Sequence, residues 1–276
     1  MNRIAFVDHR LDNFHANVFL AALRQELAPR GFTVSGCQCL DDAEGRAWGR
    51  KNNVPYFADP AELNRQADYF MVLAPSNPEV HLDLCRRVFP FGKPTYVDKT
   101  FAPDLAIARQ IFALADHHHV AVQTSSALRY TNVQAHVRQV GQANVRHMIA
   151  WGGGRSFGEY AIHPLELVIS CLGPAVESVM RRGAEPCSQL LLDFSGGRTA
   201  VVNVYVNADT PFAASVTTAT ETKFITVDGA QLFVDSMAGI LDFLEQGQPL
   251  IDRAETLAIR RILDTADAAQ GRLVKV

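Results

Sequence analysis

The stretch Lys93-Pro94-Thr95-Tyr96-Val97-Asp98-Lys99-Thr100 joins a short apolar and β-branched run to a charged pair. A helix is predicted directly after it, at 104–116, because Pro103 and Asp104 are typical of a helix start and apolar residues then recur at helical spacing. This order places Lys99 at the carboxyl end of a buried parallel strand, where open α/β sheets bind their ligands. A desolvated lysine at such a place can carry a proton. The same residues also fit a surface lysine in an ordinary strand–helix turn.

The first part of the chain alternates short apolar runs with helical patterns. The predicted strands are 3–7, 32–37, 69–74, 94–98 and 120–124, and the predicted helices are 14–28, 42–52, 60–66, 79–89 and 104–116. Strands that alternate with helices at this spacing form a parallel, doubly wound sheet. Continuous apolar strands such as 69–74 indicate that helices cover both faces. We therefore predict a Rossmann-like α/β domain with a parallel sheet over residues 1–125.

Strands follow one another without intervening helices in the second part of the chain. A helix is predicted at 130–141, a strand at 144–151, a glycine-rich loop at 152–158 and a helix at 163–172. The next predicted strands are 176–182, 188–194, 199–207, 213–220 and 223–228, and the last two predicted helices are 234–246 and 253–270. Residues Ser195-Gly196-Gly197-Arg198 fit a hairpin turn. The prediction is an α+β domain with a mostly antiparallel sheet over residues 126–276.

The composition of the 276 residues is that of a globular protein, with 48% hydrophobic and 20% charged residues. The net charge of −3 shows no basic excess, so neither nucleic acid nor a membrane surface is expected as a partner. The chain enters directly as a strand, which argues against a signal peptide. No apolar run approaches the roughly 18 residues of a membrane span. Five cysteines without a disulfide framework suggest reduced thiols and a cytoplasmic protein.

Two further stretches carry polar groups at an expected strand end or helix start. Glu159 precedes His163 by four residues, so the carboxylate can orient one imidazole nitrogen and leave the other for proton transfer. A capping Glu and a packing His explain this pair as well. The turn Pro75-Ser76-Asn77, followed by His81, exposes backbone that can lie against a cofactor. A plain turn with a helix cap fits those residues equally.

Neither the histidines nor the cysteines of the chain suggest a metal site. His117, His118 and His119 are consecutive, so their side chains point in different directions and do not converge on one ion. Cys37 and Cys39 lack a second pair, and small buried thiols are common packing residues. We therefore expect no metal.

Taken in order along the chain, these stretches resemble the glucose–fructose oxidoreductase / inositol dehydrogenase / MocA (Gfo/Idh/MocA) family. Asp98-Lys99-Thr100 corresponds to the family's Glu-Lys-Pro. Glu159 to His163 corresponds to its Asp-x-x-x-His, with Glu166 as the acid often found three residues later. Pro75-Ser76-Asn77 and the segment 125–130 occupy the expected places between these motifs. The resemblance covers nearly the whole chain and implies a dinucleotide-binding domain over residues 1–125 and a substrate-binding and oligomerisation domain over residues 126–276.

The resemblance implies an NAD(P)-dependent oxidoreductase that transfers hydride between a nicotinamide and a sugar, polyol or related hydroxy compound. It implies that His163 takes the hydroxyl proton, that Lys99 steadies the developing negative charge, and that Glu159 holds these groups in register. The implied substrate contacts are Arg129, Tyr130, Arg155, Tyr160 and His163. The implied cofactor contacts are Asp8, His9, Arg10, Leu11, Asn13, Phe14, Pro75, Ser76, Asn77, His81, Asp98 and Lys99. A homo-oligomer that forms through the C-terminal sheet is a further implication.

The first turn departs most from the family pattern. No glycine occurs before Gly31, so the segment 8–14 lacks the G-x-G-x-x-G that lets backbone approach a pyrophosphate. Side chains must therefore reshape this turn. Arg10 can contact a phosphate there, whereas Asp8 would repel one.

Two later positions also differ from the pattern. Asp41, after the second strand, can bind a ribose or simply cap the next helix, and without a basic residue beside it NAD is favoured over NADP. Thr100 replaces the family's proline, which favours a trans peptide bond. Two alternative functions fit the altered first turn. One is a non-catalytic member of the fold that binds a ligand or partner, and the other is an enzyme that keeps its nucleotide bound and recycles it.

Overall fold

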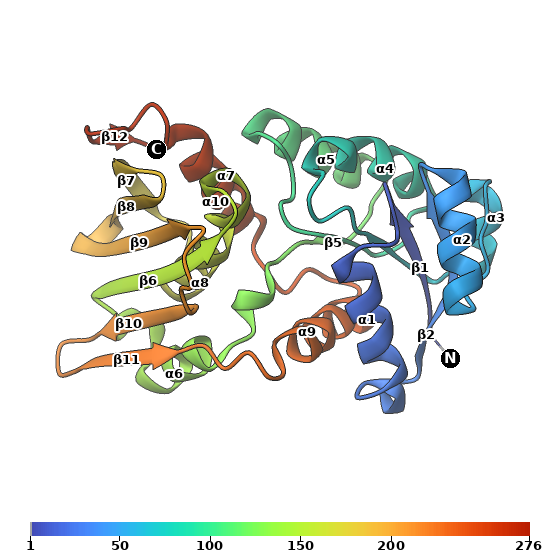
Figure 1. The fold of residues 1–276 in the computed structure, drawn as a ribbon, viewed down its shortest axis with the longest axis horizontal. Helices are drawn as coiled ribbons and strands as arrows, with labels where there is room; N and C mark the ends of the chain where they lie inside the picture. The colour runs from blue at the N-terminus through green and yellow to red at the C-terminus, as the bar shows by residue number, and fades with distance from the viewer. Residues whose placement is uncertain (1) are drawn as a thin grey trace. The chain divides into compact units, whose positions relative to one another are not determined.

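Five parallel strands form the sheet of the first unit, in the order β2-β1-β3-β4-β5 (Figure 1). The computed structural model describes residues 2–276, and the first unit contains the chain up to Ser125 together with Phe233–Asp252. Its strands are β1 Asn2–Asp8, β2 Phe32–Cys39, β3 Tyr69–Val72, β4 Thr95–Val97 and β5 Val122–Gln123. All neighbouring strands pair in parallel, which confirms the predicted Rossmann-like sheet.

Helices cover both faces of this sheet. They are α1 Phe14–Arg24, α2 Asp42–Asn52, α3 Pro60–Gln66, α4 His81–Val88, α5 Leu105–His117 and α9 Leu232–Gln246. Buried side chains of α1, α2 and α9 share one core with β1, β2 and β3, and α4 and α5 lie on the opposite face (Figure 1). The continuous apolar strands follow from this double cover, because a strand that is packed on both faces has no polar side.

Polar side chains immediately before the helices determine where they begin. Asn13, Asp41, Asp59 and Asp104 each accept a hydrogen bond from a backbone N–H of the first turn that follows. As a result, the predicted bounds of α2 and α3 agree with the structure residue for residue. Helix α1 ends earlier than predicted, because a separate 3-10 turn that contains a proline, Ala28–Arg30, follows it.

Helix α9 packs in the first unit, although it follows the strands of the second in sequence. The prediction assigns 234–246 to the second domain, whereas the structure places Met237, Ile240 and Phe243 in the core of the first unit. The apolar face of a helix shows that the helix is packed, but it cannot tell which core receives it. The segment Phe233–Asp252 is therefore a return of the chain to the first unit.

Seven strands form the sheet of the second unit, which comprises Ser126–Leu232 and Arg253–Val276. Their order is β11-β10-β6-β9-β8-β7-β12, and every pairing except that of β6 with β9 is antiparallel. The strands are β6 His147–Gly154, β7 Val176–Ala184, β8 Cys187–Phe194, β9 Arg198–Val206, β10 Ala213–Thr217, β11 Thr222–Thr226 and β12 Val274–Lys275. This arrangement confirms the predicted, mostly antiparallel sheet.

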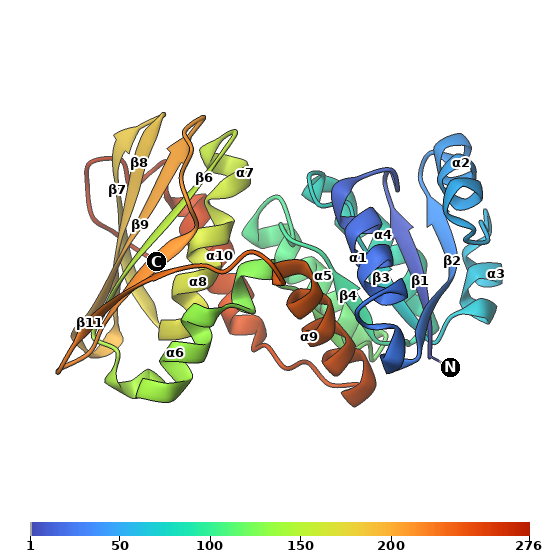
Figure 2. The same cartoon turned by 60° about the horizontal axis from the view of Figure 1, so that its bottom comes forward.

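Helices α6, α8 and α10 lie on one face of the second sheet (Figures 1 and 2). The helices of this unit are α6 Asn132–Val140, α7 Phe157–Tyr160, α8 Ile162–Leu172 and α10 Arg253–Thr265. The buried side chains of α8 share a core with those of β6, β8 and β9. Short 3-10 turns occur at Ala28–Arg30, Pro78–Val80, Phe89–Phe91, Ala127–Arg129, Gln142–Asn144 and Ser195–Gly197. None of the helices within residues 2–276 combines the length and the apolar character that crossing a membrane requires.

The predicted glycine-rich loop is a strand over its first residues. Gly152, Gly153 and Gly154 end β6 and pair with β9, so the prediction of a loop at 152–154 is wrong. A Cβ at Gly154 would collide with the ring of Tyr160, and a Cβ at Gly152 would collide with the side chains of Phe212 and Pro164. These glycines permit close packing against a strand rather than a turn.

Candidate active site

The strand order of the first sheet reverses at β1, which lies between β2 and β3. In open α/β sheets, ligands bind beside the carboxyl ends of the strands at such a switch point. Asp8 ends β1, and the backbone after β3 runs beside it, because the Leu73 N–H donates to the Val7 carbonyl at 2.9 Å. The predicted turn 75–77 then closes with a hydrogen bond from the Asn77 N–H to the Ala74 carbonyl at 3.0 Å. Two of the predicted cofactor segments therefore meet at this edge.

Lys99 lies in a buried turn directly after β4, at the strand end where the sequence places it. Only 7% of the residue is exposed, and its Nζ donates to the Pro75 carbonyl at 3.0 Å. Asp98 is 1% exposed, and its carboxylate accepts the backbone N–H of Lys99 at 2.8 Å. The Lys99–Thr100 peptide bond is cis, so the expectation of a trans bond is wrong. That expectation came from the preference of the residue type alone, which does not include the surrounding fold.

His15, which the sequence analysis does not assign to the site, pairs with Asp98. Its Nδ1 lies 2.6 Å from Oδ2 of Asp98, and the His15 side chain is 12% exposed. Burial by itself raises the pKa of Asp98, but the nearby His15 imidazole and the Lys99 charge outweigh burial, so the pKa lies below its ordinary value. Asp98 is thus held as a carboxylate by a histidine and a lysine.

His81 joins the turn after β3 to the segment after Lys99. The residue is fully buried, with Nε2 2.6 Å from the Leu73 carbonyl and Nδ1 3.0 Å from the Phe101 carbonyl. Burial lowers the pKa of the imidazole. His81 is therefore part of the frame that holds the two turns together, and its contact with a cofactor stays a prediction.

Side chains hold the glycine-free turn after β1. Asp8, which is 1% exposed, accepts hydrogen bonds from the Arg10 N–H at 3.1 Å and from Nδ2 of Asn13 at 2.9 Å. Asn13 also caps α1 by accepting the Ala16 N–H at 3.0 Å. Burial raises the pKa of Asp8 to about 6, although the hydrogen bonds to the carboxylate oppose this shift. No residue in the segment 8–14 has a positive φ, so this turn does not need the conformation that glycine supplies.

Glu44, in the first turn of α2, is hydrogen-bonded to the same turn. Its carboxylate accepts the Leu11 N–H at 3.0 Å and the Asp12 N–H at 2.5 Å. Asp41, the acid that the sequence analysis considers for a ribose, is the N-cap of α2 and accepts the N–H groups of Ala43 and Glu44. Glu44 is thus a site residue that the sequence analysis misses.

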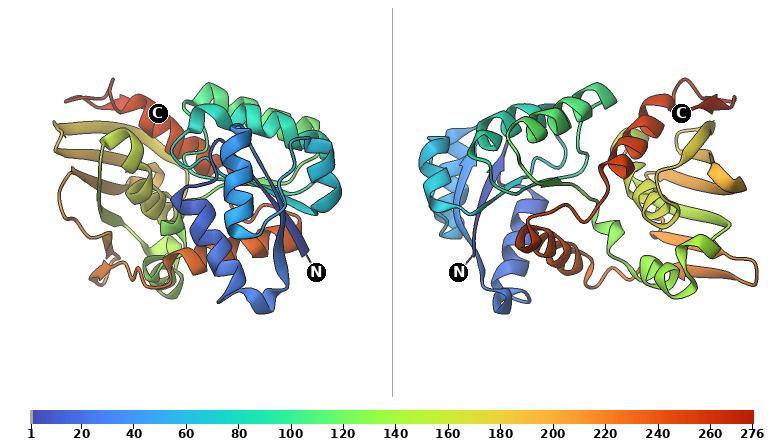
Figure 3. Two further views of the ribbon diagram at one scale, coloured as in Figure 1. Left: turned by 45° about the vertical axis from the view of Figure 1, so that its right-hand side comes forward. Right: turned by 180° about the vertical axis from the view of Figure 1, so that it is seen from behind.

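Phe14 and His15 face the start of α9, and α1 and α9 lie side by side (Figure 3). The Phe14 ring centroid lies 5.0 Å from that of Phe233, and the His15 ring lies 5.7 Å from it. Phe14 is nevertheless 63% exposed. Phe14 is therefore an exposed apolar ring beside the turn that follows β1, and its contact with a cofactor stays a prediction.

In the second unit, the polar partner of His163 is Ser126. The Oγ of Ser126 lies 2.8 Å from Nδ1 of His163 and also accepts the Leu128 N–H at 3.2 Å. Ser126 is fully buried, and His163 is half-buried at the start of α8. When the Nδ1–H of His163 donates to Ser126, Nε2 is the nitrogen that can accept a proton.

The short helix α7 brings Tyr160 to His163. The ring centroids of Tyr160 and His163 lie 5.7 Å apart, and the Phe212 ring lies 5.8 Å from His163 on the same basis. Glu159 precedes Tyr160, and its N–H donates to Oγ of Ser156, which caps α7. The orientation of His163 by Glu159 stays a prediction, as do the substrate contacts of Tyr130, which is half-buried, and of Arg155, which is exposed.

Arg129 forms two ion pairs in the second unit, one with the buried Glu166 and one with the half-buried Glu255. Its Nε lies 2.6 Å from Glu166, and its guanidinium lies 2.7 Å from Glu255. Burial opposes the charge on Arg129, but the two carboxylates outweigh burial and raise the pKa of the guanidinium. These bonds give Arg129 and Glu166 a structural role, and a substrate contact by Arg129 stays a prediction.

A dinucleotide fits the strand ends near Lys99 better than it fits the turn after β1. The switch point, the buried Lys99 and the turn 75–77 offer polar groups at the strand ends, as nucleotide-binding folds require. The backbone N–H groups of Leu11 and Asp12, which would bind phosphate oxygens, are instead bonded to Glu44. The arrangement thus fits the nicotinamide end and disagrees at the pyrophosphate.

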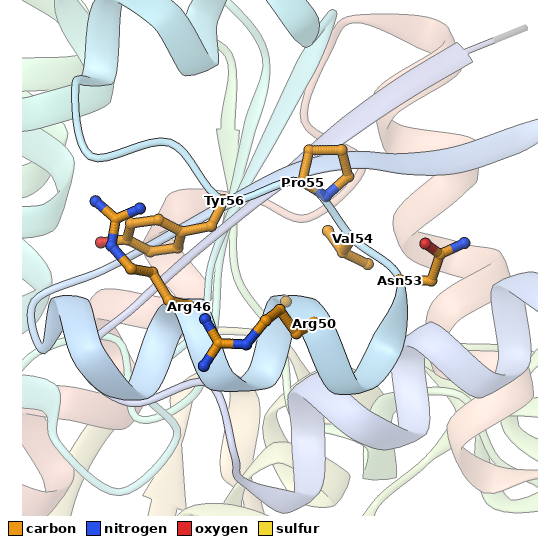
Figure 4. A pocket seen from close by; sticks show the side chains of 7 residues that line it. Arg46, Arg50, Asn53, Val54, Pro55 and Tyr56 are labelled. Atoms are coloured by element: carbon orange, nitrogen blue, oxygen red, sulfur yellow. The ribbon is translucent and has the colours of Figure 1, made fainter.

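A separate hollow of about 460 Å³ lies beside α2 (Figure 4). Arg46 and Arg50 project from α2 into it, and the Arg46 guanidinium lies 4.8 Å from the centre of the Tyr56 ring. Its lining residues are Arg46, Gly49, Arg50, Asn53, Val54, Pro55 and Tyr56. None of the predicted site residues lines this hollow.

No protein-family model matches the sequence, and no curated protein matches it. Solved structures do match the fold. A protein described as a probable dehydrogenase from Thermotoga maritima superposes with a TM-score of 0.84 at 13% identity, covering 99% of this chain and 98% of that one. The myo-inositol 2-dehydrogenase from Lactobacillus plantarum gives 0.82 at 12% identity, with 100% and 99% coverage. An oxidoreductase from Agrobacterium radiobacter, in complex with NAD+, L-tartaric acid and magnesium, gives 0.80 at 14% identity, with 99% and 98% coverage. The likeness confirms the two-domain fold that the resemblance implies.

Proposed function

We propose that the protein is an oxidoreductase of the Gfo/Idh/MocA family that uses a nicotinamide nucleotide, with NAD favoured over NADP, and acts on a hydroxyl group of a sugar, polyol or related compound. The observation that carries the proposal is the buried Lys99, hydrogen-bonded beside the switch point and next to an ionised Asp98. Proteins with a similar fold support it, because one is a myo-inositol 2-dehydrogenase and another is an oxidoreductase bound to NAD+. When bound, the nicotinamide would accept or return a hydride.

Lys99 has the task of stabilising charge. Its ammonium would donate a hydrogen bond to the reacting oxygen as that oxygen loses its proton. The Pro75 carbonyl and the Asp98 carboxylate hold the turn in place, so little reorganisation is needed during the reaction.

His163 has the task of moving the proton. Nε2 would accept the hydroxyl proton, while Nδ1–H donates to Ser126 and keeps the ring in one tautomer. Glu159 is proposed to support the imidazolium that forms. Tyr130, Tyr160, Arg155 and Arg129 remain the proposed substrate contacts.

The test is turnover of the purified protein with NAD or NADP and a panel of sugars and polyols, followed by the absorbance of the reduced nicotinamide. Lys99→Met and His163→Asn are each expected to lower kcat by about a hundredfold or more. Lys223→Ala and His147→Asn are matched controls in β11 and β6 and are expected to retain the wild-type rate. Equal rates for Lys99→Met and wild type would remove the assigned role of Lys99.

A non-catalytic protein of the same fold is the second candidate. The contact of Glu44 with the Leu11 and Asp12 N–H groups favours it, because these donors are already used. An enzyme that retains and recycles its nucleotide is distinguished by mass spectrometry of small molecules released from the denatured protein. Isothermal titration with each of the four nicotinamide nucleotides separates these cases from the main proposal.

We further propose that the second sheet mediates self-association. Phe224 is 62% exposed on β11, and its ring lies 5.6 Å from that of Trp151. Tyr205, Pro211 and Ala213 join them around a hollow of about 460 Å³. Exposed aromatic clusters of this kind mark protein interfaces. Sedimentation should show an oligomer for wild type and a smaller species for Phe224→Asp.

A further inference from the structure

The turn after β1 binds a carboxylate of its own chain in the way that backbone binds a phosphate. Oε2 of Glu44 accepts the Leu11 N–H at 3.0 Å, and Oε1 accepts the Asp12 N–H at 2.5 Å. Two consecutive N–H groups thus point at the two oxygens of one anion. Consecutive backbone donors of this kind form anion sites in phosphate-binding loops.

The surroundings hold Glu44 in this position. Asp41 caps α2 and orients its first turn, in which Glu44 lies. The thiol of Cys39 donates to Oε2 of Glu44 at 3.1 Å. Burial is the larger cause and the hydrogen bond to Glu44 the smaller cause that raise the pKa of the Cys39 thiol to about 12. The thiol therefore keeps its hydrogen and remains a donor. The carboxylate therefore has two backbone donors and shares the single Cys39 thiol hydrogen with the His9 carbonyl.

A second feature of the turn is an unpaired polar atom. The Nδ1 atom of His9, a half-buried residue, is buried and has no hydrogen-bond partner among residues 2–276. Buried polar atoms in native proteins are normally paired, so this nitrogen is a polar group that a ligand or a water at the turn can use. His9 also accepts the Cys39 thiol through its carbonyl at 3.0 Å, which places it beside the Glu44 contact.

The carboxylates around the turn oppose a pyrophosphate while Glu44 stays in place, whereas Arg10, the cation of the segment 8–14, favours one. Asp8 lies beneath the turn with its carboxylate bonded to Arg10 and Asn13. Asp12 is exposed and lies 3.4 Å from the ammonium of Lys51. A pyrophosphate that used the Leu11 and Asp12 donors would therefore have to replace the charge of Glu44, because adding its own to it is unfavourable.

We propose that Glu44 is an affinity-determining residue of the nucleotide site. Its carboxylate occupies the position of a phosphate on the Leu11 and Asp12 N–H groups, and the pyrophosphate of a dinucleotide must displace it. The inference rests on the proposed function in taking a dinucleotide as the ligand. Glu44 thereby weakens the binding of a dinucleotide, and it holds the turn after β1 in place when no ligand is bound.

The experiment measures binding by isothermal titration with two probes. ADP carries a pyrophosphate without a nicotinamide, and NADH carries both. Glu44→Ala frees both backbone donors and removes one negative charge, so both probes should bind at least about tenfold more tightly than to wild type. Glu44→Gln keeps one acceptor oxygen and should give a smaller gain. Glu62→Ala, which removes an exposed acid from α3, is the matched control and should bind as wild type does.

A second measurement does not depend on affinity. Amide hydrogen exchange at Leu11 and Asp12 should be faster in Glu44→Ala than in wild type, and saturating ADP should slow it again. Exchange elsewhere in β1 and α1 reports whether the variant keeps its fold.

The outcomes separate the inference from the proposed function. If Glu44→Ala and wild type have the same affinity for ADP, including the case in which neither binds, the inference is overturned. Unchanged exchange at Leu11 and Asp12 in Glu44→Ala would overturn it as well. If Glu44→Ala gains affinity for ADP but no variant transfers hydride with any nicotinamide nucleotide, the role of Glu44 stands and the proposed dehydrogenase activity fails.

Discussion

Nδ1 of His15 and Oδ2 of Asp98 lie 2.6 Å apart, although 83 positions separate the two residues in sequence. The contact joins the first turn of α1 to the end of β4. It therefore couples the glycine-free turn, where a nucleotide is proposed to bind, to the turn that carries Lys99. The same carboxylate accepts the Lys99 N–H at 2.8 Å, so both neighbours depend on one acid.

Removal of this charge should destabilise the protein. Asp98→Asn keeps an acceptor for the Lys99 N–H but leaves His15 without its anion, and breaking a buried pair of this kind costs about 3–5 kcal/mol. The pKa of Asp98 is lowered because its neighbours outweigh burial. Its contribution to stability is therefore present above the unfolded-state pKa and is lost as pH falls through the folded-state pKa. Urea unfolding should show a large gap between variant and wild type at neutral pH that narrows in acid, and a gap independent of pH would contradict the assignment.

Asp8 should show the opposite pH dependence. Burial raises the pKa of Asp8 to about 6 from its ordinary value of 3.8. A raised carboxyl pKa means that the protonated form is favoured in the folded state, so stability is full below the unfolded-state pKa and declines as pH rises through about 6. The decline amounts to about 3 kcal/mol for a shift of this size. Asp8→Asn cannot ionise and should lack it.

The measurement for Asp8 is the free energy of unfolding in urea at several pH values between the two pKa values and above them. As pH rises, the free energy of unfolding of wild type should fall relative to that of Asp8→Asn. The difference between the two free energies should level off above pH 6. Asp41→Asn, which changes an exposed capping acid, is a control for general charge effects. A constant difference across the range would show that Asp8 titrates normally.

The sequence predicts those features that depend on neighbouring residues. Helix starts were predictable because a capping side chain such as Asp59 or Asp104 stands directly before the helix. The parallel sheet was predictable because strands and helices alternate at a regular spacing. Lys99 was placed at a strand end for the same reason.

The contacts that define the site lie beyond such local patterns. Three such contacts join segments that only the folded chain brings together. They are His15 with Asp98, Glu44 with Leu11, and Ser126 with His163. A motif search shows that the first turn lacks the expected glycines. It cannot show that the Glu44 side chain accepts the backbone N–H groups of that turn. The packing of α9 in the first unit could not be predicted for a similar reason. An apolar helix face shows that the helix is buried but not which core it joins.

Arg129 should be essential for the stability of the second unit. Arg129→Met leaves Glu166 and Glu255 without their shared cation, and Glu166 is only 4% exposed. Loss of one partner from a buried ion pair costs about 3–5 kcal/mol. Burial already raises the pKa of Glu166 while Arg129 opposes it, so the variant should raise that pKa further and lose more stability as pH rises.

Chemical denaturation tests this at several pH values, with Arg146→Met as the control, because Arg146 is exposed on the same unit. The control is expected to change stability by less than about 0.5 kcal/mol. If Arg129→Met were as stable as Arg146→Met, the ion pairs would contribute little. Arg129 would then be better explained by its predicted contact with substrate.

Ser126 should act as a positioning residue for His163. Ser126→Ala removes the hydroxyl that lies 2.8 Å from Nδ1 of His163, and with it the contact that favours a proton on that nitrogen. In the proposed reaction only the tautomer with a free Nε2 accepts the proton, so kcat should fall by about tenfold while KM changes little. Nitrogen NMR of the His163 ring should show a mixture of the two tautomers in the variant, a change that loss of packing alone would not produce.

Thr199→Ala is the matched control for Ser126→Ala. Thr199 forms a hydroxyl–imidazole contact of the same 2.8 Å length with His147, so its removal should leave kcat and the His163 signals unchanged. A single Nδ1–H tautomer in both Ser126→Ala and wild type would show that another group, such as Glu159, orients the ring.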